Sequence, residues 1–312
     1  MSSAKNNSMP ISEWKAHASI IGVNLIHSFN YIIAKEVMPK YVKPFGFIIL
    51  RVWGAMILFW LTSLFIKKDK IEKKDWPRLL LCSIFGVGLN QILFLKGLNL
   101  ASAVDASIMM SCTPIIVLAL TAIILKEKLL TNQISGVALG FAGAIILITN
   151  RGEINLNSNA LLGNGLIFLN SISWGLYLVL AKPLMHKYHP ITITKWAFLL
   201  GCGWAIPFGL HDFINIDWIN MPLTIGLGIL YVILMTTFVA YFLNMYSLKT
   251  LSPSLISFYI YIQPVCTAII AILAGKDEIT LVKIFATLLI FAGIYVINTK
   301  RNAPLASPKP MA

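Results

Sequence analysis

Charged residues are scarce in this sequence. Of its 312 residues, 12% are Asp, Glu, Lys or Arg, whereas 58% are apolar. Because a soluble domain carries about a quarter charged residues, this chain has too few of them to cover a water-facing surface. The shortage excludes an ordinary soluble domain and indicates an integral membrane protein.

Chemically reactive groups are also scarce within the long apolar runs. Glu36, Asp105, Glu127 and Glu278 lie at the ends of such runs, and His27 is the only histidine well inside one. Neither HExxH nor GxSxG occurs, and the four cysteines have no metal-ligand spacing. An enzyme, which would need a nucleophile with a base or clustered metal ligands, is therefore disfavoured, and no cofactor is expected. A membrane scaffold or receptor remains an alternative.

Ten apolar runs are long enough to cross a bilayer. A helix needs roughly 17–25 predominantly apolar residues to span the hydrocarbon core. The sequence therefore predicts an all-α membrane protein with ten transmembrane helices. The expected spans lie at about 16–35, 45–66, 78–98, 104–125, 133–149, 161–181, 191–210, 222–246, 253–274 and 281–298.

Basic residues give the chain a formal net charge of +13 and indicate its orientation. Cytoplasmic connections of membrane proteins are enriched in Lys and Arg. We therefore expect cytoplasmic N- and C-termini in the inner (plasma) membrane of a bacterium, with the lipid bilayer as a partner. Nucleic acid is not an expected partner, because the basic residues line one membrane face without aromatic interleaving. The richest connection follows the second run and holds Lys67, Lys68, Lys70, Lys73, Lys74 and Arg78.

The second half of the chain repeats the first. A shift of 150 residues aligns Pro114 with Pro264 and the triplet FAG at 141–143 with the same triplet at 291–293. Each half then holds five runs, and because five is odd the second half enters the membrane inverted. Inverted repeats are common in secondary transporters, which bind substrate near the midplane between the halves. The expected five-helix halves are residues 1–150 and 151–312.

The two aligned prolines lie near the middle of their apolar runs. A proline inside a helix removes one hydrogen bond and frees the carbonyl four residues earlier, here at Met110 and Ile260. In hydrocarbon such a carbonyl survives only against protein or a water-filled cavity. We therefore predict helix kinks at Pro114 and Pro264 that flank a central cavity, with a simple packing kink as the alternative.

Polar and aromatic residues recur at helical spacing in the first, third, fourth, sixth, eighth and ninth runs. This set is symmetric under the repeat and predicts six helices around one cavity, whereas the other four runs are barer. The alternative is interhelical hydrogen bonding, worth about 1 kcal/mol or less per bond. The predicted substrate-binding residues are Asn24, His27, Tyr31, Asn90, Phe94, Ser107, Ser111, Asn170, Trp174, Tyr177, Thr237, Tyr241, Asn244, Ser257 and Tyr261.

His27 lies near the centre of the first run, on one helical face with Asn24 and Tyr31. Burial without a nearby carboxylate favours the neutral imidazole, which still donates one hydrogen bond and accepts another. Three roles remain open for His27: holding a polar group of the substrate, bonding a neighbouring helix, or carrying a proton.

The stretch from 87 to 148 resembles the EamA-type repeat of the drug/metabolite transporter superfamily. It combines a Gly-rich third run, a Pro-containing fourth run that ends in Glu127, and the glycines of "GVALG" in the fifth. Arg51 in "ILRVWGA" fits the single basic residue that the family often carries in its second span. The resemblance implies ten helices, cytoplasmic termini and transport of small metabolites, often export. The first run departs from the family, with "HSFNY" where "WGSNF" is common.

The sequence therefore predicts a secondary transporter of a small-molecule substrate, working by alternating access. Amide, hydroxyl and aromatic side chains in the expected cavity suit amino acids or related neutral or zwitterionic solutes, moved outward. A multidrug or cation extruder is the alternative, although such proteins usually place an acid in the membrane. Glycines in the fifth run fit packing within the bundle or a dimer seam, so we expect a monomer or weak homodimer.

Overall fold

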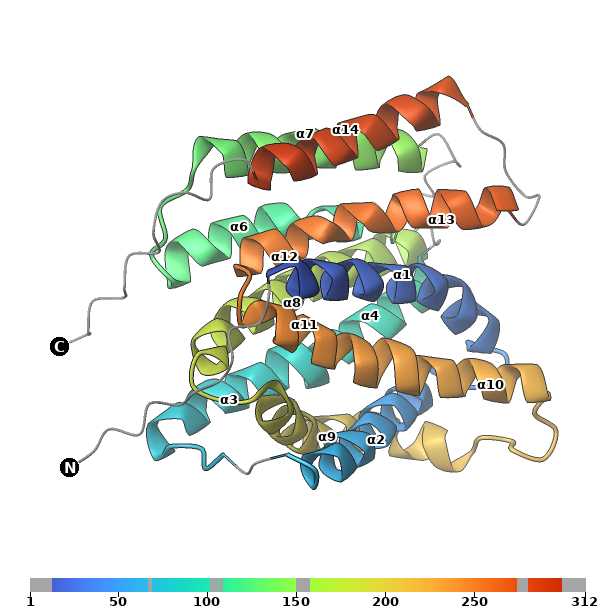
Figure 1. Cartoon of the computed structure of the whole chain (residues 1–312). Coiled ribbons are helices and arrows are strands. Elements are labelled where there is room, and N and C mark those ends of the chain that lie inside the picture. Colours follow the sequence, from blue (N-terminus) through green and yellow to red (C-terminus); the bar gives the residue numbers. More distant parts are fainter. Residues whose placement is uncertain are drawn as a thin grey trace, which may run out of the picture.

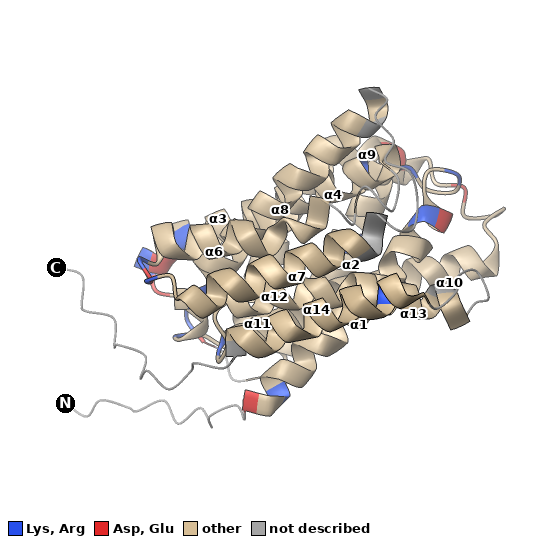
Figure 2. Ribbon diagram, turned by 90° about the horizontal axis from the view of Figure 1, so that it is seen from above, with Lys and Arg blue, Asp and Glu red and all other residues tan. Residues whose placement is uncertain are grey.

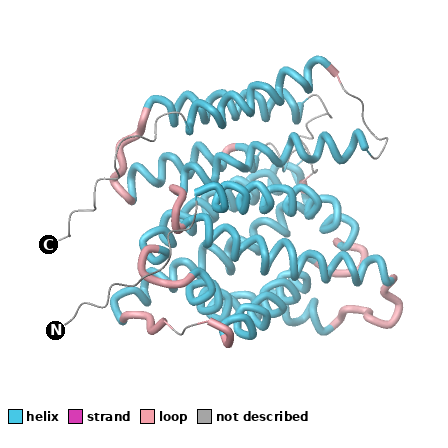
Figure 3. Tube along the Cα trace, viewed as in Figure 1, coloured by secondary structure: helices cyan, strands magenta, loops and turns pink. Residues whose placement is uncertain are grey.

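The computed structural model describes residues 13–66, 69–101, 106, 109–149, 158–273 and 280–298. Within these ranges the chain is helical and contains no β-strand (Figure 3). The helical elements are α1 (Glu13–Val37), α2 (Pro44–Ser63), η1 (Lys73–Asp75), α3 (Trp76–Ser83), η2 (Ile84–Gly88), α4 (Leu89–Leu100), α6 (Thr113–Ile124), α7 (Thr131–Thr149), α8 (Ser158–Met185), α9 (Pro190–Ile214), α10 (Leu223–Tyr231), η3 (Val232–Val239), α11 (Ala240–Leu248), α12 (Pro253–Phe258), η4 (Tyr259–Tyr261), α13 (Ile262–Leu273) and α14 (Leu281–Asn298).

Several apolar helices are suited to a bilayer. In the described part of the chain, six helical stretches are long and apolar enough to span a membrane, and three shorter apolar helices accompany them. The six are Pro44–Ser63, Lys73–Leu100, Leu161–Met185, Pro190–Ile214, Leu223–Leu248 and Pro253–Ile270. The shorter ones are Met109–Ile124, Thr131–Ile146 and Leu281–Ile297. The all-helical, membrane-spanning class predicted from the apolar runs is confirmed.

Helix α1 covers the first expected span but is not among the six apolar stretches. Its 25 residues include Asn24, His27, Ser28 and Asn30, which lower its average hydropathy. Asn24, Ser28 and Asn30 are buried. The helix lies between α11 and α13 (Figure 1), with Leu25 and Phe29 on an exposed face and its buried polar side chains on the face that other helices cover. A helix face covered by protein can carry polar side chains that a lipid-facing surface cannot.

Prolines begin several of the helices. Pro44, Pro190 and Pro253 are the first residues of α2, α9 and α12. At this position the missing N–H has no intrahelical partner to lose, and the fixed φ of proline already suits a helix. Two of these starts carry a side-chain cap: His189 accepts from the Ile191 N–H, and Ser252 accepts from the Leu255 N–H.

Corresponding helices of the two halves pack against each other. α7 lies along α14, and α2 lies along α9 (Figure 1). A Cβ atom added to Gly136 would lie 2.9 Å from the Gly293 carbonyl oxygen, and one added to Gly143 would lie 2.6 Å from that of Ala286. Positions 136 and 286, like 143 and 293, are 150 residues apart. Position 136 of the first half meets position 293 of the second, and the equivalents of these two positions, 286 and 143, meet each other. Such a reciprocal pair of contacts is the pattern that a two-fold axis between the two helices would give.

Two half-buried lysines bind helix ends in matching places. Lys35 Nζ donates to the Ala101 carbonyl oxygen at 2.8 Å, at the end of α4. Lys182 Nζ donates to the carbonyl oxygens of Leu248 at 2.7 Å and Leu251 at 2.9 Å, at the end of α11. These last carbonyls have no partner within their own helices, so the lysines satisfy them and complement the negative helix ends.

The connections before α3 and before α9 are joined by a group of polar contacts that we name the loop clasp: Asp69, Asp75, Lys187, Tyr188 and His189. Asp75 accepts from Lys187 Nζ at 2.9 Å and from the Tyr188 hydroxyl at 2.8 Å. Asp69 accepts from the His189 N–H at 2.8 Å. Figure 2 shows charged residues gathered towards the helix ends and connections, whereas the middles of the helices carry few. The loop clasp thus lies outside the apolar centre.

Candidate substrate-binding site

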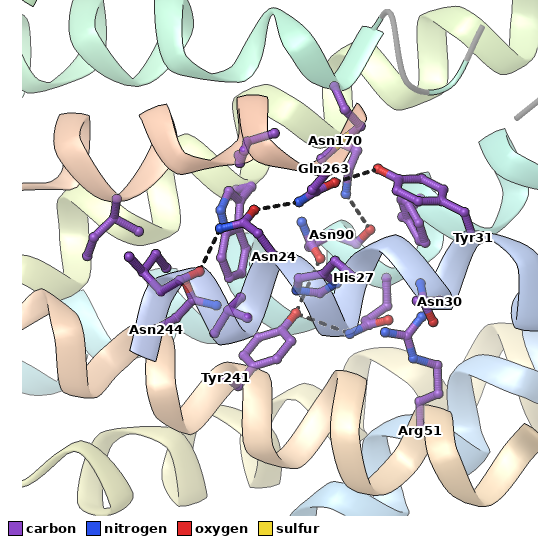
Figure 4. A pocket seen from close by; sticks show the side chains of 18 residues that line it. Asn24, His27, Asn30, Tyr31, Arg51, Asn90, Asn170, Tyr241, Asn244 and Gln263 are labelled. Atoms are coloured by element: carbon purple, nitrogen blue, oxygen red, sulfur yellow. Dashed lines mark hydrogen bonds between the residues drawn. The ribbon is translucent and has the colours of Figure 1, made fainter. Parts of the chain in front are cut away.

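A polar cavity lies among helices from both halves of the chain (Figure 4). Six lining residues come from the buried face of α1. The described residues that line the cavity are Ile20, Val23, Asn24, His27, Asn30, Tyr31, Arg51, Asn90, Gln91, Phe94, Met110, Asn170, Trp174, Tyr241, Asn244, Ile256, Ile260 and Gln263.

The structure places nine of the predicted substrate-binding residues in this lining. All six runs that were expected to surround a cavity contribute, although the fourth and ninth do so through residues that were not predicted. Whether the nine bind substrate stays a prediction. They are Asn24, His27, Tyr31, Asn90, Phe94, Asn170, Trp174, Tyr241 and Asn244.

Three further predicted residues point to other partners. Tyr177 is fully buried and packs against Trp174 and Gly86. The Ser257 hydroxyl donates to the Ser254 carbonyl oxygen at 2.8 Å, so it is satisfied within its own helix. Tyr261 is buried against Phe258 on the side of α7. These residues support the packing around the cavity and do not line it.

The remaining predicted residues are Ser111, Thr237 and Ser107. Ser111 is buried and does not line the cavity. Thr237 supports the lining from behind: its hydroxyl accepts from Arg51 Nε at 3.1 Å and donates to the Val232 carbonyl oxygen at 2.8 Å. Ser107 lies outside the described residues.

Several lining residues were missed by the sequence reasoning. Arg51 lies in the second run, which was expected to be barer than the six cavity runs, and a single polar residue gives no periodic signal. Gln91 directly follows Asn90, and Gln263 directly precedes Pro264. Asn90 and Pro264 had been singled out, but their neighbours had not. Asn30 neighbours Tyr31. Neighbours differ by about 100° around a helix, and a pattern of spacings does not tell how wide the cavity-facing sector is.

Both fourth and ninth helical stretches are interrupted just before their prolines. Helical geometry breaks at Cys112, two residues before Pro114, and α6 begins at the next residue, Thr113. In the second half, α12 gives way to the 3-10 turn η4, and α13 begins two residues before Pro264. Met110 and Ile260, the residues whose carbonyls the prolines were expected to free, both line the cavity.

One end of the cavity is closed by a network of neutral amides. Gln263 Nε2 donates to Asn24 Oδ1 at 2.9 Å, and the Tyr31 hydroxyl donates to Gln263 Oε1 at 3.3 Å. Asn24 Nδ2 donates to the Ile20 carbonyl oxygen at 2.7 Å. This network ties α1 to α13, and its members already satisfy one another. It therefore positions the helices across the two halves.

A second group of polar contacts is centred on Tyr241. The Tyr241 hydroxyl donates to the Gly86 carbonyl oxygen at 2.7 Å and accepts from Gln91 Nε2 at 3.1 Å. Gly86 lies in the π-helical segment η2, and a second π-helical segment, η3, ends beside Ala240. Such segments are frequent at functional sites because they leave carbonyls without a regular helical partner. Trp174 meets the Tyr241 ring edge-on, with 5.5 Å between the ring centroids.

Arg51 brings a cation to the cavity wall. Its side chain is buried and Nε donates to Thr237, but Nη1 has no hydrogen-bond partner. The Oδ1 atom of Asn30, on α1, also has no partner. None of the described lining residues is an Asp or Glu. The cavity thus combines hydrogen-bonded amides and aromatic faces with a buried charged donor on Arg51 and a buried acceptor on Asn30 that have no partner.

Comparisons with known proteins agree with a transport protein. The family model described as "EamA-like transporter family" matches residues 14–149 and 161–299. A protein of Archaeoglobus fulgidus named "Uncharacterized transporter" is 28% identical over 295 residues, covering 92% of this chain and 99% of its own length. Transporter YetK of Bacillus subtilis is 26% identical over 300 residues, covering 94% of this chain and 89% of its own length.

The fold has also been seen in a solved structure. A crystal structure of another protein superposes with a TM-score of 0.70 at 17% sequence identity. The superposition covers 91% of this chain and 96% of the other. The family resemblance seen in the sequence, which rested on the proline-containing fourth run and the glycine-rich fifth, is confirmed by the match to the family model. The chain belongs to the EamA-like transporter family, within the drug/metabolite transporter superfamily.

Proposed function

We propose that the protein is a secondary transporter that exports amino acids or related neutral or zwitterionic metabolites across the inner membrane. The observation that carries this proposal is the polar cavity in the middle of an apolar helix bundle. Polar side chains are costly in the hydrocarbon region and cluster where a solute passes. Family membership supports a transporter; the substrate and direction are our inference from the lining.

The proposed mechanism is alternating access between two inverted five-helix halves, residues 1–150 and 151–312. The exchanged glycine contacts between α7 and α14 support a two-fold relation between the halves. The matching roles of Lys35 and Lys182 support it as well. Cavity residues come from both halves, so rocking one half against the other would open the site to alternate sides.

The proposed orientation places both termini and the loop clasp in the cytoplasm. The Lys-rich connection before α3 supports it, because basic connections stay on the cytoplasmic side. Ten spanning helices are needed for this arrangement. The shorter apolar helices α6, α7 and α14, together with the polar α1, complete the number beside the six longer stretches.

The lining supports a zwitterionic or neutral substrate over a cationic one. A cation extruder would be expected to pair its substrate with a membrane-embedded acid. The described lining instead holds amides, aromatic rings and Arg51, which would repel a cation. A drug or cation extruder is therefore our second choice.

Transport by the purified protein in liposomes tests the proposal. We expect counterflow of at least one L-amino acid, and loss of that counterflow in Trp174→Ala and Tyr241→Ala, because both rings line the cavity. Trp218→Ala is a matched control, since Trp218 is exposed and outside the lining. Normal counterflow in both cavity variants would contradict the assignment of this cavity. Absence of any solute movement by the wild-type protein would favour a scaffold.

A further inference from the structure

Arg51 is a buried cation without a counterion. Its side chain is only 3% exposed, and its single hydrogen bond goes to the neutral hydroxyl of Thr237. Nη1 is fully buried with no partner. No ion pair of Arg51 is present in the described chain, and no acid lines the cavity there. Arg51 therefore lines the cavity without a compensating negative charge among the described residues.

An uncompensated charge in the middle of a membrane protein is costly. Arg and Lys inside the membrane pair with other groups or mark the path of a substrate. A guanidinium differs from an ammonium in presenting a planar fork of donors that matches a carboxylate. Arg51 lines the cavity, donates from Nε to Thr237 and has no partner for its buried Nη1, so this nitrogen can donate to a carboxylate oxygen that reaches it.

Asn30 supplies the complementary group. It lies on α1 and is 1% exposed, and its Oδ1 atom has no hydrogen-bond partner. Figure 4 shows the Arg51 side chain extending towards Asn30, away from the network of Asn24 and Gln263. A carbonyl oxygen only accepts hydrogen bonds, so it suits an ammonium or another donor. This end of the cavity thus offers a positively charged hydrogen-bond donor and a neutral hydrogen-bond acceptor, both without a partner.

The two free groups match the two charges of an α-amino acid. We propose that the cavity binds the α-amino acid head group, with the carboxylate on Arg51 and the ammonium on Asn30 Oδ1. This inference rests on the proposed function and deepens it. The rest of the substrate lies along Phe94, Trp174 and Tyr241, whose rings form part of the lining. Amines, sugars and nucleosides, which lack a carboxylate, are excluded as principal substrates.

Thermal shift of the purified full-length protein tests the assignment, because a bound ligand stabilises the folded state. All twenty L-amino acids are screened first. The strongest binder is then compared with its amide, which lacks the negative charge, and with the acid that lacks the α-amino group. We expect the amide to bind at least about 30-fold more weakly, because the charge of Arg51 would be left buried and unpaired. The deaminated acid should bind about 10–150-fold more weakly, since one hydrogen bond from a charged group is lost.

Variants of Arg51 complete the test. Arg51→Gln should weaken the amino acid at least about 30-fold and remove the discrimination between acid and amide. Arg51→Lys, which keeps the charge but not the fork, should retain the discrimination with weaker binding. Arg78→Gln removes an arginine outside the cavity and should behave as wild type. The comparison of acid with amide on the wild-type protein does not depend on any variant folding.

The outcomes separate two failures. If an amino acid and its amide stabilise the wild-type protein equally, or if folded Arg51→Gln binds the amino acid like wild type, the assignment of the carboxylate to Arg51 is wrong while amino acid transport stands. If no amino acid stabilises the wild-type protein, both the proposed substrate class and this inference fall.

Discussion

Two buried charges in this protein have opposite surroundings. Asp75, in the loop clasp, accepts hydrogen bonds from Lys187 and Tyr188 and is paired with the Lys187 ammonium. Arg51, in the cavity, donates to one neutral hydroxyl and leaves Nη1 without a partner. Both residues are more than nine-tenths buried. The two residues have similarly low exposure but unequal pairing: Asp75 is paired within the structure, whereas Arg51 is the charge that we propose to bind a ligand.

The difference follows from the cost of burying charge. Breaking a buried pair by removing one partner costs about 3–5 kcal/mol, because the other charge is left uncompensated. Arg51 already bears a penalty of this kind in the absence of substrate. Removing its charge should therefore relieve the fold, whereas removing the charge of Asp75 should damage it.

The largest expected effect concerns Arg51. Arg51→Gln should lower amino acid counterflow at low substrate concentration by at least about 30-fold, without lowering the midpoint of thermal unfolding measured in the absence of substrate. Counterflow in liposomes and unfolding in detergent measure the two quantities on the same preparation. A variant that unfolds at much lower temperature would show that Arg51 is structural and would break the comparison.

The next effect concerns Asp75. Asp75→Ala removes the acceptor for Lys187 and Tyr188, and we expect it to lower the free energy of unfolding by about 1.5–3 kcal/mol, the usual worth of hydrogen bonds to a charged group. Chemical denaturation measures this quantity. Glu36→Ala is the control, since Glu36 is exposed and should change stability by about 0.5 kcal/mol or less. Unchanged stability in Asp75→Ala would show that the loop clasp is not structural.

A smaller effect is expected at His27, which lines the cavity without a hydrogen bond in the described chain. His27→Gln should transport nearly as wild type, because an amide also donates and accepts. His27→Ala should lower transport about 5–10-fold, the worth of one hydrogen bond. Counterflow measured between pH 6 and 8 distinguishes the roles. Normal transport by His27→Gln with loss of a pH dependence seen in wild type would make His27 the proton carrier. If both variants transport like wild type, neither functional role stands.

The smallest effect concerns His189 of the loop clasp. Burial lowers the pKa of the His189 imidazole, and the nearby Lys249 lowers it further, while Asp69 raises it less. His189 is therefore harder to protonate in the folded protein than in the unfolded chain. As the pH falls below about 6.5, the ordinary pKa of histidine, protonation favours the unfolded chain and the free energy of unfolding decreases. Protonated Nδ1 would also stop accepting from the Ile191 N–H.

We expect the unfolding midpoint of wild type to fall more between pH 7.5 and 5.5 than that of His189→Asn. Asparagine keeps an N-cap acceptor and does not titrate in this range. Equal falls in the two proteins would remove His189 as a source of pH sensitivity.

Much of the fold could be predicted from the sequence. Runs of apolar residues identify membrane-crossing helices because a helix must be predominantly apolar over its whole length to be stable in the hydrocarbon core. Polar residues at helical spacing within those runs, such as Asn24 and His27, indicate which helix faces avoid lipid. The nine predicted residues that line the cavity were found in this way.

Other parts of the site could not be predicted. The Ser257 hydroxyl donates to a backbone carbonyl oxygen of its own helix. Serine hydroxyls often do so, and the spacing of polar residues in a sequence does not reveal it. Arg51 is isolated in its run, so it forms no pattern, and Asn30 and Gln263 depend on the rotation of α1 and α13. The rotation of each helix about its axis is set by packing, for example by the close approach of glycines to a neighbouring helix. The sequence shows that these glycines are present but not which helix they contact.

The most direct test of alternating access is the accessibility of a cavity residue from each side of the membrane. Asn244→Cys, in a variant whose four native cysteines are replaced, places one thiol in the cavity lining. Right-side-out and inside-out vesicles are treated with a membrane-impermeant thiol reagent. The proposed mechanism predicts labelling from both sides, with a saturating amino acid changing the two rates in opposite directions or protecting the thiol. Labelling from one side only, under all substrate conditions, would contradict alternating access around this cavity.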